Sequence, residues 1–389
     1  MTRTRGFRPI LWLLLLGALG TAQALFDHAA AARTQGAKQA PRYEVDPLWP
    51  KPLPNHWVLG NAIGVWADEA LELKAGDCCA GAPPVLAFDT QGNLVQSWGG
   101  PGAGYDWPTG NHGIFVGHTG LVWIGGNGAG DSHILKFTQD GKFVAQYGKP
   151  NARQTGTGAQ GQPAFAPGSS DPTSFGRVAK IFVDPKANEA YVADGYLNKR
   201  VAVIDADTGA FKRYWGAYGN KPDDTDLGKY DPEAPLAQQF RSPVHCAELA
   251  NDGLVYVCDR ANDRIQVFSK DGKFVKEKVI AKRTLGDGSV WDIAFSRDPA
   301  QKYIYLADGK NEKIYVIERA TLEILSTFGD GGRQPGQFFG VHSIATDSKG
   351  NLYTTETYEG KRLQKFVYRG IGPVPKPDQG TPWPDAASR

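Results

Sequence analysis

The chain has 389 residues, enough for one large domain or two ordinary ones. Its 48 glycines and 26 prolines, against a single methionine, favour short strands joined by tight turns over a helical protein. The formal net charge of +2 provides no electrostatic footprint for nucleic acid, so we expect no nucleic-acid partner.

The first 24 residues have the pattern of a secretory signal peptide. Arg3, Arg5 and Arg8 precede an apolar run that ends in the small-residue motif at residues 22–24. The run is too short to favour a membrane span. We therefore expect a periplasmic or secreted protein with no stable membrane span after cleavage, and an uncleaved N-terminal anchor is the alternative. Residues 25–41 are expected to form a flexible segment.

Export would allow disulfide bonds to form. Cys246 and Cys258 lie on neighbouring predicted strands and could pair across them. Cys78 and Cys79 are adjacent, so a bond between them would need a strained ring. The sequence leaves the connectivity open.

One pattern of strands and turns recurs along residues 42–370. Each unit has an apolar opening strand, a second strand, a polar loop, a third strand, a turn such as "QDGK" or "DTGA", and a closing strand. Turns of this kind between alternating apolar runs indicate β-hairpins. The opening strands are expected at 62–68, 111–117, 178–184, 244–250, 290–296 and 341–347. The closing strands are expected at 94–99, 143–148, 211–216, 274–279 and 323–329.

Six such units predict an all-β protein, a six-bladed β-propeller made of four-stranded antiparallel sheets. The sixth unit lacks a closing strand of its own. Residues 42–47, "RYEVDP", can supply that strand and close the ring. Residues 371–389 are then a C-terminal tail. Two long polar insertions, 149–177 and 217–243, separate units and are expected to be functional or mobile.

Histidine occurs at one position of every second opening strand. The six aligned residues are Ile63, His112, Ala179, His245, Trp291 and His342. Opening strands of a propeller lie next to the axis, and alternate blades of six are separated by a third of a turn. His112, His245 and His342 can therefore converge on one axial point as ligands of a divalent metal with an open position. Taken singly, each would read as a core histidine.

Two loop residues are expected near this point. Loops 193–200 and 258–264 should lie on the face where the histidines head their strands, which places Tyr196 and Arg260 beside the metal. A tyrosine near a cation can ionise and act as a base, and an arginine can hold a carboxylate through two hydrogen bonds. The alternative is that both residues form ordinary hydrogen bonds within their blades.

These motifs resemble NHL repeats and, in particular, the lyase domain of peptidylglycine α-amidating enzymes. "NHGIFV", "VHCAEL" and "VHSIAT" are similar to the strands that hold zinc in that family. "ADGYLNKR" and "CDRANDRIQ" are similar to the loops that carry its tyrosine and arginine, which points to Tyr196 and Arg260. The chain departs from the family in two places. The first unit contains no arginine, Lys74 being its only cation, and Ser343 follows the third histidine where the lyase has an acid.

The resemblance implies a metal-dependent lyase, with zinc as the metal, that breaks the carbon–nitrogen bond of a carbinolamide. The metal would polarise the substrate hydroxyl, Tyr196 would remove its proton, and Arg260 would bind the acid. The ligand would be a small molecule or peptide at the central axis, and the sequence leaves the identity of any protein partner unknown.

Two other functions compete with this one. A calcium-dependent lactonase would need oxygen ligands at the axis, for which Asp292 and Asn61 are the nearby candidates, and calcium is the alternative metal. A non-catalytic propeller that binds a protein, glycan or peptide in the periplasm is the third reading, because function depends on the site and not on the fold.

Overall fold

The computed structural model describes residues 38–65 and 80–384. The predicted signal peptide and most of the predicted flexible segment therefore lie outside the described residues, as do Lys74, Cys78 and Cys79. Within the described part of the chain, none of the helices has both the length and the apolar character that crossing a membrane requires.

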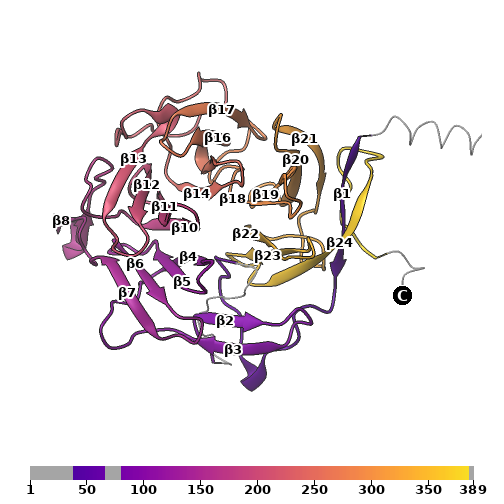
Figure 1. The fold of residues 1–389 in the computed structure, drawn as a ribbon, viewed down its shortest axis with the longest axis horizontal. Coiled ribbons are helices and arrows are strands. Elements are labelled where there is room, and N and C mark those ends of the chain that lie inside the picture. The colour runs from indigo at the N-terminus through magenta and orange to yellow at the C-terminus, as the bar shows by residue number, and fades with distance from the viewer. Residues whose placement is uncertain (1–37, 66–79, 385–389) are drawn as a thin grey trace, which may run out of the picture.

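Five four-stranded antiparallel sheets surround a common centre, and the opening strand of each repeat unit faces inward (Figure 1). The closing strands fall where the turn motifs predict them. The first three of these sheets contain β4 (Asn111–Val116), β5 (Val122–Gly126), β6 (His133–Phe137) and β7 (Phe143–Gly148); β10 (Val178–Asp184), β11 (Glu189–Asp194), β12 (Arg200–Asp205) and β13 (Phe211–Trp215); and β14 (Val244–Leu249), β15 (Leu254–Asp259), β16 (Arg264–Ser269) and β17 (Phe274–Val279).

The last two of the five sheets complete this part of the array. They contain β18 (Asp292–Phe295), β19 (Tyr303–Asp308), β20 (Lys313–Glu318) and β21 (Glu323–Phe328); and β22 (Val341–Thr346), β23 (Leu352–Glu356), β24 (Leu363–Pro373) and β1 (Gln39–Asp46).

The N-terminal strand β1 is the outermost strand of the last sheet. It pairs antiparallel with β24 from Asp46 opposite Lys365 to Gln39 opposite Pro373. The strand begins three residues before the predicted start of the repeat region, and Ala40 is fully buried. Residues beyond β24 also bind this edge of the molecule, because Val45 N donates to the carbonyl of Pro382.

The first unit differs from its prediction. Among its described residues, only β2 (Val85–Phe88) and β3 (Leu94–Trp98) form a sheet. The predicted opening strand at 62–68 is not a strand over its described residues, 62–65. These residues bind a neighbouring sheet instead, since Ala62 N donates to the carbonyl of Glu356. Hydrophobic periodicity alone does not distinguish an inner strand from an extended segment held between two sheets.

Hairpin turns fix the packing between successive units. Gly141 and Gly272 have φ values of +81° and +85°, which favour glycine. A Cβ atom at either position would lie 2.8 Å from an indole ring of the preceding unit, that of Trp98 or Trp215. The Asx-Gly signal in the sequence therefore specifies both a turn and a contact between sheets.

Buried ion pairs join strands within the sheets. Asp194 at the end of β11 bonds Arg200 at the start of β12 at 2.9 Å, and Asp259 bonds Arg264 at 2.7 Å in the next sheet. All four side chains are fully buried. Each carboxylate also accepts a backbone N–H from the segment that enters its unit, from Gly176 and Arg241 respectively. These pairs hold the loops that lead into the inner strands.

A third buried carboxylate lacks such a partner and should make stability depend on pH. Asp263 accepts the Ser289 N–H through Oδ1, while its buried Oδ2 has no hydrogen bond. Burial raises the pKa of Asp263 to about 7. The folded carboxyl therefore keeps its proton at pH values where the unfolded one has lost it, and the folded state loses stability as the pH rises from about 4 to 7.

We expect Asp263→Asn to remove this component of the pH dependence. Relative to wild type, the variant should gain on the order of 1 kcal/mol in unfolding free energy between about pH 5 and pH 8. Urea unfolding of both proteins at the two pH values measures the difference. If the difference in unfolding free energy between the two proteins were the same at both pH values, Asp263 would be ionised without cost in the folded protein.

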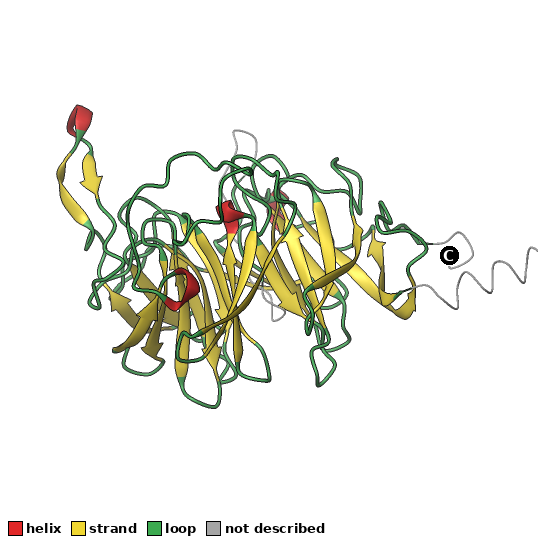
Figure 2. Cartoon of the chain, turned by 90° about the horizontal axis from the view of Figure 1, so that it is seen from above, coloured by secondary structure: helices red, strands yellow, loops and turns green. Residues whose placement is uncertain are grey.

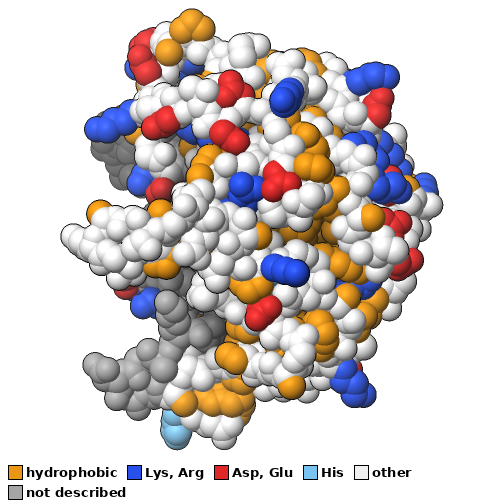
Figure 3. Space-filling view, turned by 90° about the vertical axis from the view of Figure 1, so that its left-hand side faces the viewer, with side chains coloured by type: hydrophobic (Ala, Val, Ile, Leu, Met, Phe, Trp, Pro, Cys, Tyr) orange, Lys and Arg blue, Asp and Glu red, His pale blue; other side chains and the backbone are white. Residues whose placement is uncertain are grey.

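The insertion after β7 forms a hairpin of β8 (Gln154–Thr157) and β9 (Pro163–Phe165), which stands away from the sheets in Figure 2 with the short helix η2 (Ala159–Gly161) at its tip. On the face shown in Figure 3, Lys and Arg side chains are interspersed with Asp and Glu. That face presents no broad area of a single charge.

Candidate metal centre

Three buried histidines converge at the centre of the sheet array. Each is the second residue of an inner strand: His112 in β4, His245 in β14 and His342 in β22. Their available nitrogen atoms all lie within 4.8 Å of one another. The structure thus brings together the three residues that the alternating column in the sequence predicts, and they can hold a metal ion.

Backbone carbonyls of the intervening strands orient these rings. His112 Nδ1 lies 2.6 Å from the carbonyl oxygen of Ala179, and His245 Nδ1 bonds that of Trp291. Since a carbonyl can only accept, Nδ1 carries the proton in both rings and the lone pair is on Nε2. Hydrogen bonds of this kind fix the tautomer of metal-binding histidines.

The third ring is held less completely. His342 Nδ1 has no hydrogen bond of standard geometry, although the backbone of Ile63 acts to raise its pKa. Ile63, Ala179 and Trp291 are the residues that alternate with the histidines in the sequence column. That the backbone of these residues holds the histidine rings was not predicted from the sequence, although their alternation with the histidines in the aligned column was visible.

All three imidazoles are held in the neutral form. Burial lowers the pKa of His112 to about 3, with the Ala179 carbonyl opposing the shift. Burial also lowers the pKa values of His245 and His342 well below the usual range, and the charge of Arg260 adds to the effect. A neutral imidazole is the form that binds a metal, so protons compete poorly for this site.

Tyr196 and Arg260 lie directly against the histidines. Tyr196, in the turn between β11 and β12, has its hydroxyl 2.9 Å from His112 Nε2 and 3.0 Å from His245 Nε2. Arg260 begins the short helix η4 (Arg260–Asn262) and donates from a terminal nitrogen to that hydroxyl at 3.2 Å. Burial raises the pKa of Tyr196, and the Arg260 charge opposes this.

Hydrogen-bond acceptors outnumber the available protons at this point. Two Nε2 lone pairs face the hydroxyl of Tyr196, which has only one proton to donate. The other lone pair therefore faces an oxygen atom, an arrangement that a cation between the rings would relieve. This donor set fits a metal ion such as zinc, which binds imidazole nitrogen readily.

The structure also shows how Arg260 is positioned. Its guanidinium lies 4.4 Å from the ring centroid of Trp291 and 3.7 Å from the carboxylate of Asp287. Its Nε is buried and has no hydrogen-bond partner. Trp291 and Asp287 were not predicted as site residues, and nothing in their spacing distinguishes them from loop and core positions.

A buried charge cluster lies near the histidines, and its lysine adds to the effect of burial in lowering the pKa values of His112 and His342. Lys180, next to Ala179 in β10, bonds both carboxylate oxygens of Asp292 at 2.7 and 2.9 Å. It also lies 2.9 Å from Glu248, whose pKa burial raises to about 7. Asp292 is thus occupied by an ammonium group, and Asn61 is exposed, so the two oxygen ligands considered for calcium do not form a site.

A disulfide bond connects the ligand strand to the arginine loop. Cys246 and Cys258 are bonded across β14 and β15, where they lie directly opposite each other. Cys246 follows His245, and Cys258 precedes Arg260 by two residues. The bond resolves part of the connectivity that the sequence left open, and it ties two site residues to one rigid pair of strands.

Four-stranded sheets set around a centre, each with its first strand inward, define a β-propeller-like protein, here with a buried three-histidine site. No protein-family model matches the chain. It is 27% identical to mouse NHL repeat-containing protein 3 over 351 residues, 84% of each chain. It is 28% identical over 200 residues to peptidyl-glycine alpha-amidating monooxygenase B of Xenopus laevis, which is 50% of this chain and 21% of that protein.

The homologues are therefore NHL repeat-containing proteins and the lyase domain of the amidating monooxygenases, as the sequence motifs predict. The chain spans about a fifth of the length of the Xenopus enzyme. Among solved structures, a streptogramin B lyase matches with a TM-score of 0.49 at 15% identity, covering 85% of this chain and 98% of that one.

Proposed function

We propose that the protein is an exported, metal-dependent lyase that breaks the carbon–nitrogen bond of an N-acyl α-hydroxyglycine or a peptide ending in that group. The observation that carries the proposal is the position of the Tyr196 hydroxyl, within 3.0 Å of two imidazole nitrogens and within reach of Arg260. A base, an anion-binding group and three metal ligands therefore meet at one buried point.

The chain's own residues have distinct roles in this reaction. His112, His245 and His342 would hold the metal, for which we propose zinc, and the metal would supply Lewis-acid polarisation of the substrate hydroxyl. Tyr196 would act as a phenolate, which the charges of Arg260 and the metal would favour. It takes the hydroxyl proton and returns it to the leaving nitrogen as the carbon–nitrogen bond breaks. The products are an amide and glyoxylate, so atoms and charges balance.

Arg260 would bind the substrate carboxylate. Its Nε lacks a partner, and one of its terminal nitrogens is only loosely held by Asp287 at 3.7 Å. An edge of the guanidinium can therefore donate two hydrogen bonds to a carboxylate, whose oxygens accept them. Trp291 beneath the guanidinium keeps that edge in place.

The wider architecture that we propose is a closed ring of six units. Residues 57–65 with β2 and β3 would form the first unit, and the pairing of β1 with β24 would close the ring. The disulfide between Cys246 and Cys258 supports a periplasmic or secreted location, because such bonds persist in oxidising compartments.

The test is turnover of N-benzoyl-α-hydroxyglycine by the zinc-loaded mature protein. We expect benzamide and glyoxylate in equal amounts, and loss of both products after metal removal by a chelator. Readdition of zinc should restore them. A protein that binds about one zinc per chain but forms neither product would contradict the lyase and favour a binding propeller.

A further inference from the structure

The pairing register of the inner strands shifts at or beside each histidine. The shifts fall at residues 112–114 in β4, 244–246 in β14 and 341–343 in β22. β10 has the same irregularity at 178–180, around Ala179. A β-bulge redirects nearby side chains and leaves its extra residue unpaired. Strand pairing alone therefore does not fix the direction of the histidine rings, and other contacts must hold them.

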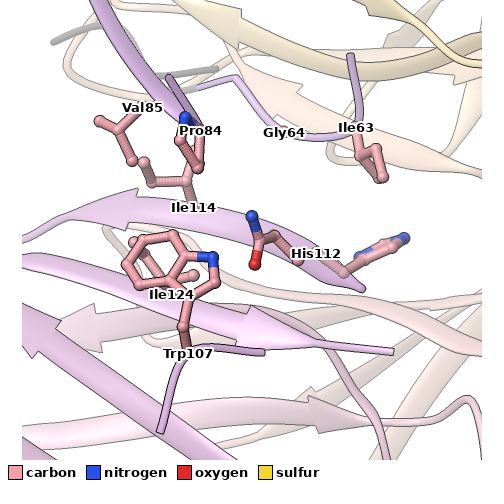
Figure 4. Close-up of a pocket in the computed structure, with 10 residues that line it drawn as sticks. Ile63, Gly64, Pro84, Val85, Trp107, His112, Ile114 and Ile124 are labelled. Carbon is pink, nitrogen blue, oxygen red and sulfur yellow. The ribbon is translucent and has the colours of Figure 1, made fainter. Parts of the chain in front are cut away.

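The Nδ1 side of His112 is supported from β10 and not from the first unit. The described first-unit side chains that line the cavity beside His112 are apolar, those of Ile63, Pro84 and Val85. The cavity measures about 30 Å³, room for about one water molecule. In Figure 4 the His112 ring points away from Pro84 and Val85. The polar support of Nδ1 is the Ala179 carbonyl, at 2.6 Å.

Asp292 connects this support with that of the second ring. It directly follows Trp291, whose carbonyl oxygen accepts a hydrogen bond from His245 Nδ1. Its carboxylate oxygens lie 2.7 and 2.9 Å from the ammonium group of Lys180, which directly follows Ala179. One carboxylate therefore links the two backbone segments that hold His112 and His245.

The same carboxylate holds β22 beside the third ring. Asp292 Oδ2 accepts hydrogen bonds from the hydroxyl of Ser343 and from the N–H of Ile344, the two residues that follow His342. His342 Nδ1 has no hydrogen bond of standard geometry. The bond from Ser343 thus compensates for the support that the ring itself lacks.

The cluster around Asp292 is shielded from water. Asp292, Lys180 and Ser343 are all buried. Glu248 in β14, also buried, lies 2.9 Å from Lys180. Four neighbouring inner strands, β10, β14, β18 and β22, thus contribute to one polar network. Buried networks of paired groups are rigid, because each broken contact leaves a polar group without a partner.

We infer that Asp292 is a positioning residue of the metal centre. Through Lys180, through its own backbone and through Ser343, its carboxylate sets the places of the three imidazoles relative to one another. The inference rests on the metal centre of the proposed function, but it does not depend on the reaction. It can therefore be tested by metal binding without turnover.

The test is the zinc affinity of the mature protein and its variants, measured by competition with a chelating indicator. Ser343→Ala changes no charge and removes the hydroxyl that binds Asp292, so zinc should bind about tenfold more weakly. Asp292→Asn replaces one accepting oxygen with an NH₂ group, and the affinity should fall by about tenfold to a hundredfold. Cobalt(II) in place of zinc should give both variants an altered visible spectrum, because that spectrum depends on the ligand geometry.

A third variant separates position from charge. The ammonium group of Lys180 repels a metal ion, so by charge alone Lys180→Met would tighten zinc binding. Because Lys180 also ties the Asp292 carboxylate to β10, we expect the opposite result. Zinc should bind to Lys180→Met about tenfold more weakly than to wild type.

Two controls match these changes outside the cluster. The hydroxyl of Ser296 donates to a neighbouring aspartate, Asp298, and Ser296→Ala should keep the wild-type zinc affinity. Lys136 is a buried lysine of β6 whose ammonium group donates to the Ala206 carbonyl at 2.7 Å. Lys136→Met should keep the wild-type zinc affinity and cobalt spectrum, whatever stability it loses.

The outcomes separate this inference from the proposed reaction. Wild-type zinc affinity and cobalt spectrum in Ser343→Ala, tighter binding in Lys180→Met, or an equal loss in the two controls would overturn it. If Asp292→Asn or Lys180→Met does not fold, Ser343→Ala decides alone. A wild-type protein that binds no zinc would overturn both hypotheses. Weaker binding in the cluster variants, without turnover of N-benzoyl-α-hydroxyglycine by wild type, would refute the lyase and leave the positioning role standing.

Discussion

Replacing His245 with alanine will remove the bound metal while most of the fold persists. The remaining histidines provide only two ligands, so the affinity for zinc should fall by at least about a hundredfold. The carbonyl of Trp291 would also lose its partner, which costs about 1–3 kcal/mol of stability. Elemental analysis of the purified protein measures the metal, and circular dichroism measures the fold.

Two further variants make this result specific. His342→Ala removes no hydrogen bond of standard geometry at Nδ1, because His342 Nδ1 makes none. It should lose the metal with less effect on stability. His118→Ala changes an exposed histidine outside the cluster and should keep the full metal content. Normal zinc content in both His245→Ala and His342→Ala would rule out the three-histidine centre.

Tyr196→Phe should abolish turnover of N-benzoyl-α-hydroxyglycine without removing the metal. The variant keeps the ring, which contacts His112 and His245, but loses the hydroxyl that we propose as the base. Loss of a general base lowers kcat by about 10²–10⁴. The measurement is kcat at saturating substrate, together with metal content.

A matched control comes from another tyrosine in the same chain. The Tyr218 hydroxyl accepts a hydrogen bond from Arg264 at 2.9 Å, as Tyr196 does from Arg260, but it lies away from the histidines. Tyr218→Phe should retain normal kcat. If Tyr196→Phe turned over at the wild-type rate with zinc bound, another group would have to take the hydroxyl proton.

Most of the fold could be predicted because its signals are local. The turn before β7 and the turn before β17 each place a glycine where φ is positive, and a short closing strand follows. The first unit could not be predicted in this way. Residues 62–65 have strand-like composition, but among the described residues Ala62 N donates to the carbonyl of Glu356 in a neighbouring sheet.

The parts of the candidate site that could be predicted are those whose residues occupy equivalent positions in successive units. His112, His245 and His342 occupy equivalent positions, so one alignment predicts their meeting. Lys180 and Asp292 also lie on inner strands, but their pairing depends on which side chains reach across the centre. Asn111 stands beside His112 in the sequence, yet only the structure shows that its Oδ1 is unpaired.

Because each histidine ring contacts the backbone of a neighbouring unit, we expect the centre to form late in folding. Each ring lies against the backbone of a neighbouring unit, at Ala179, Trp291 or Ile63, so the site draws on residues from Ile63 to His342. Contacts between residues so far apart in sequence form late, after the local hairpins. A nascent chain that ends before β22 lacks His342, so the three histidines meet only once nearly the whole chain has folded.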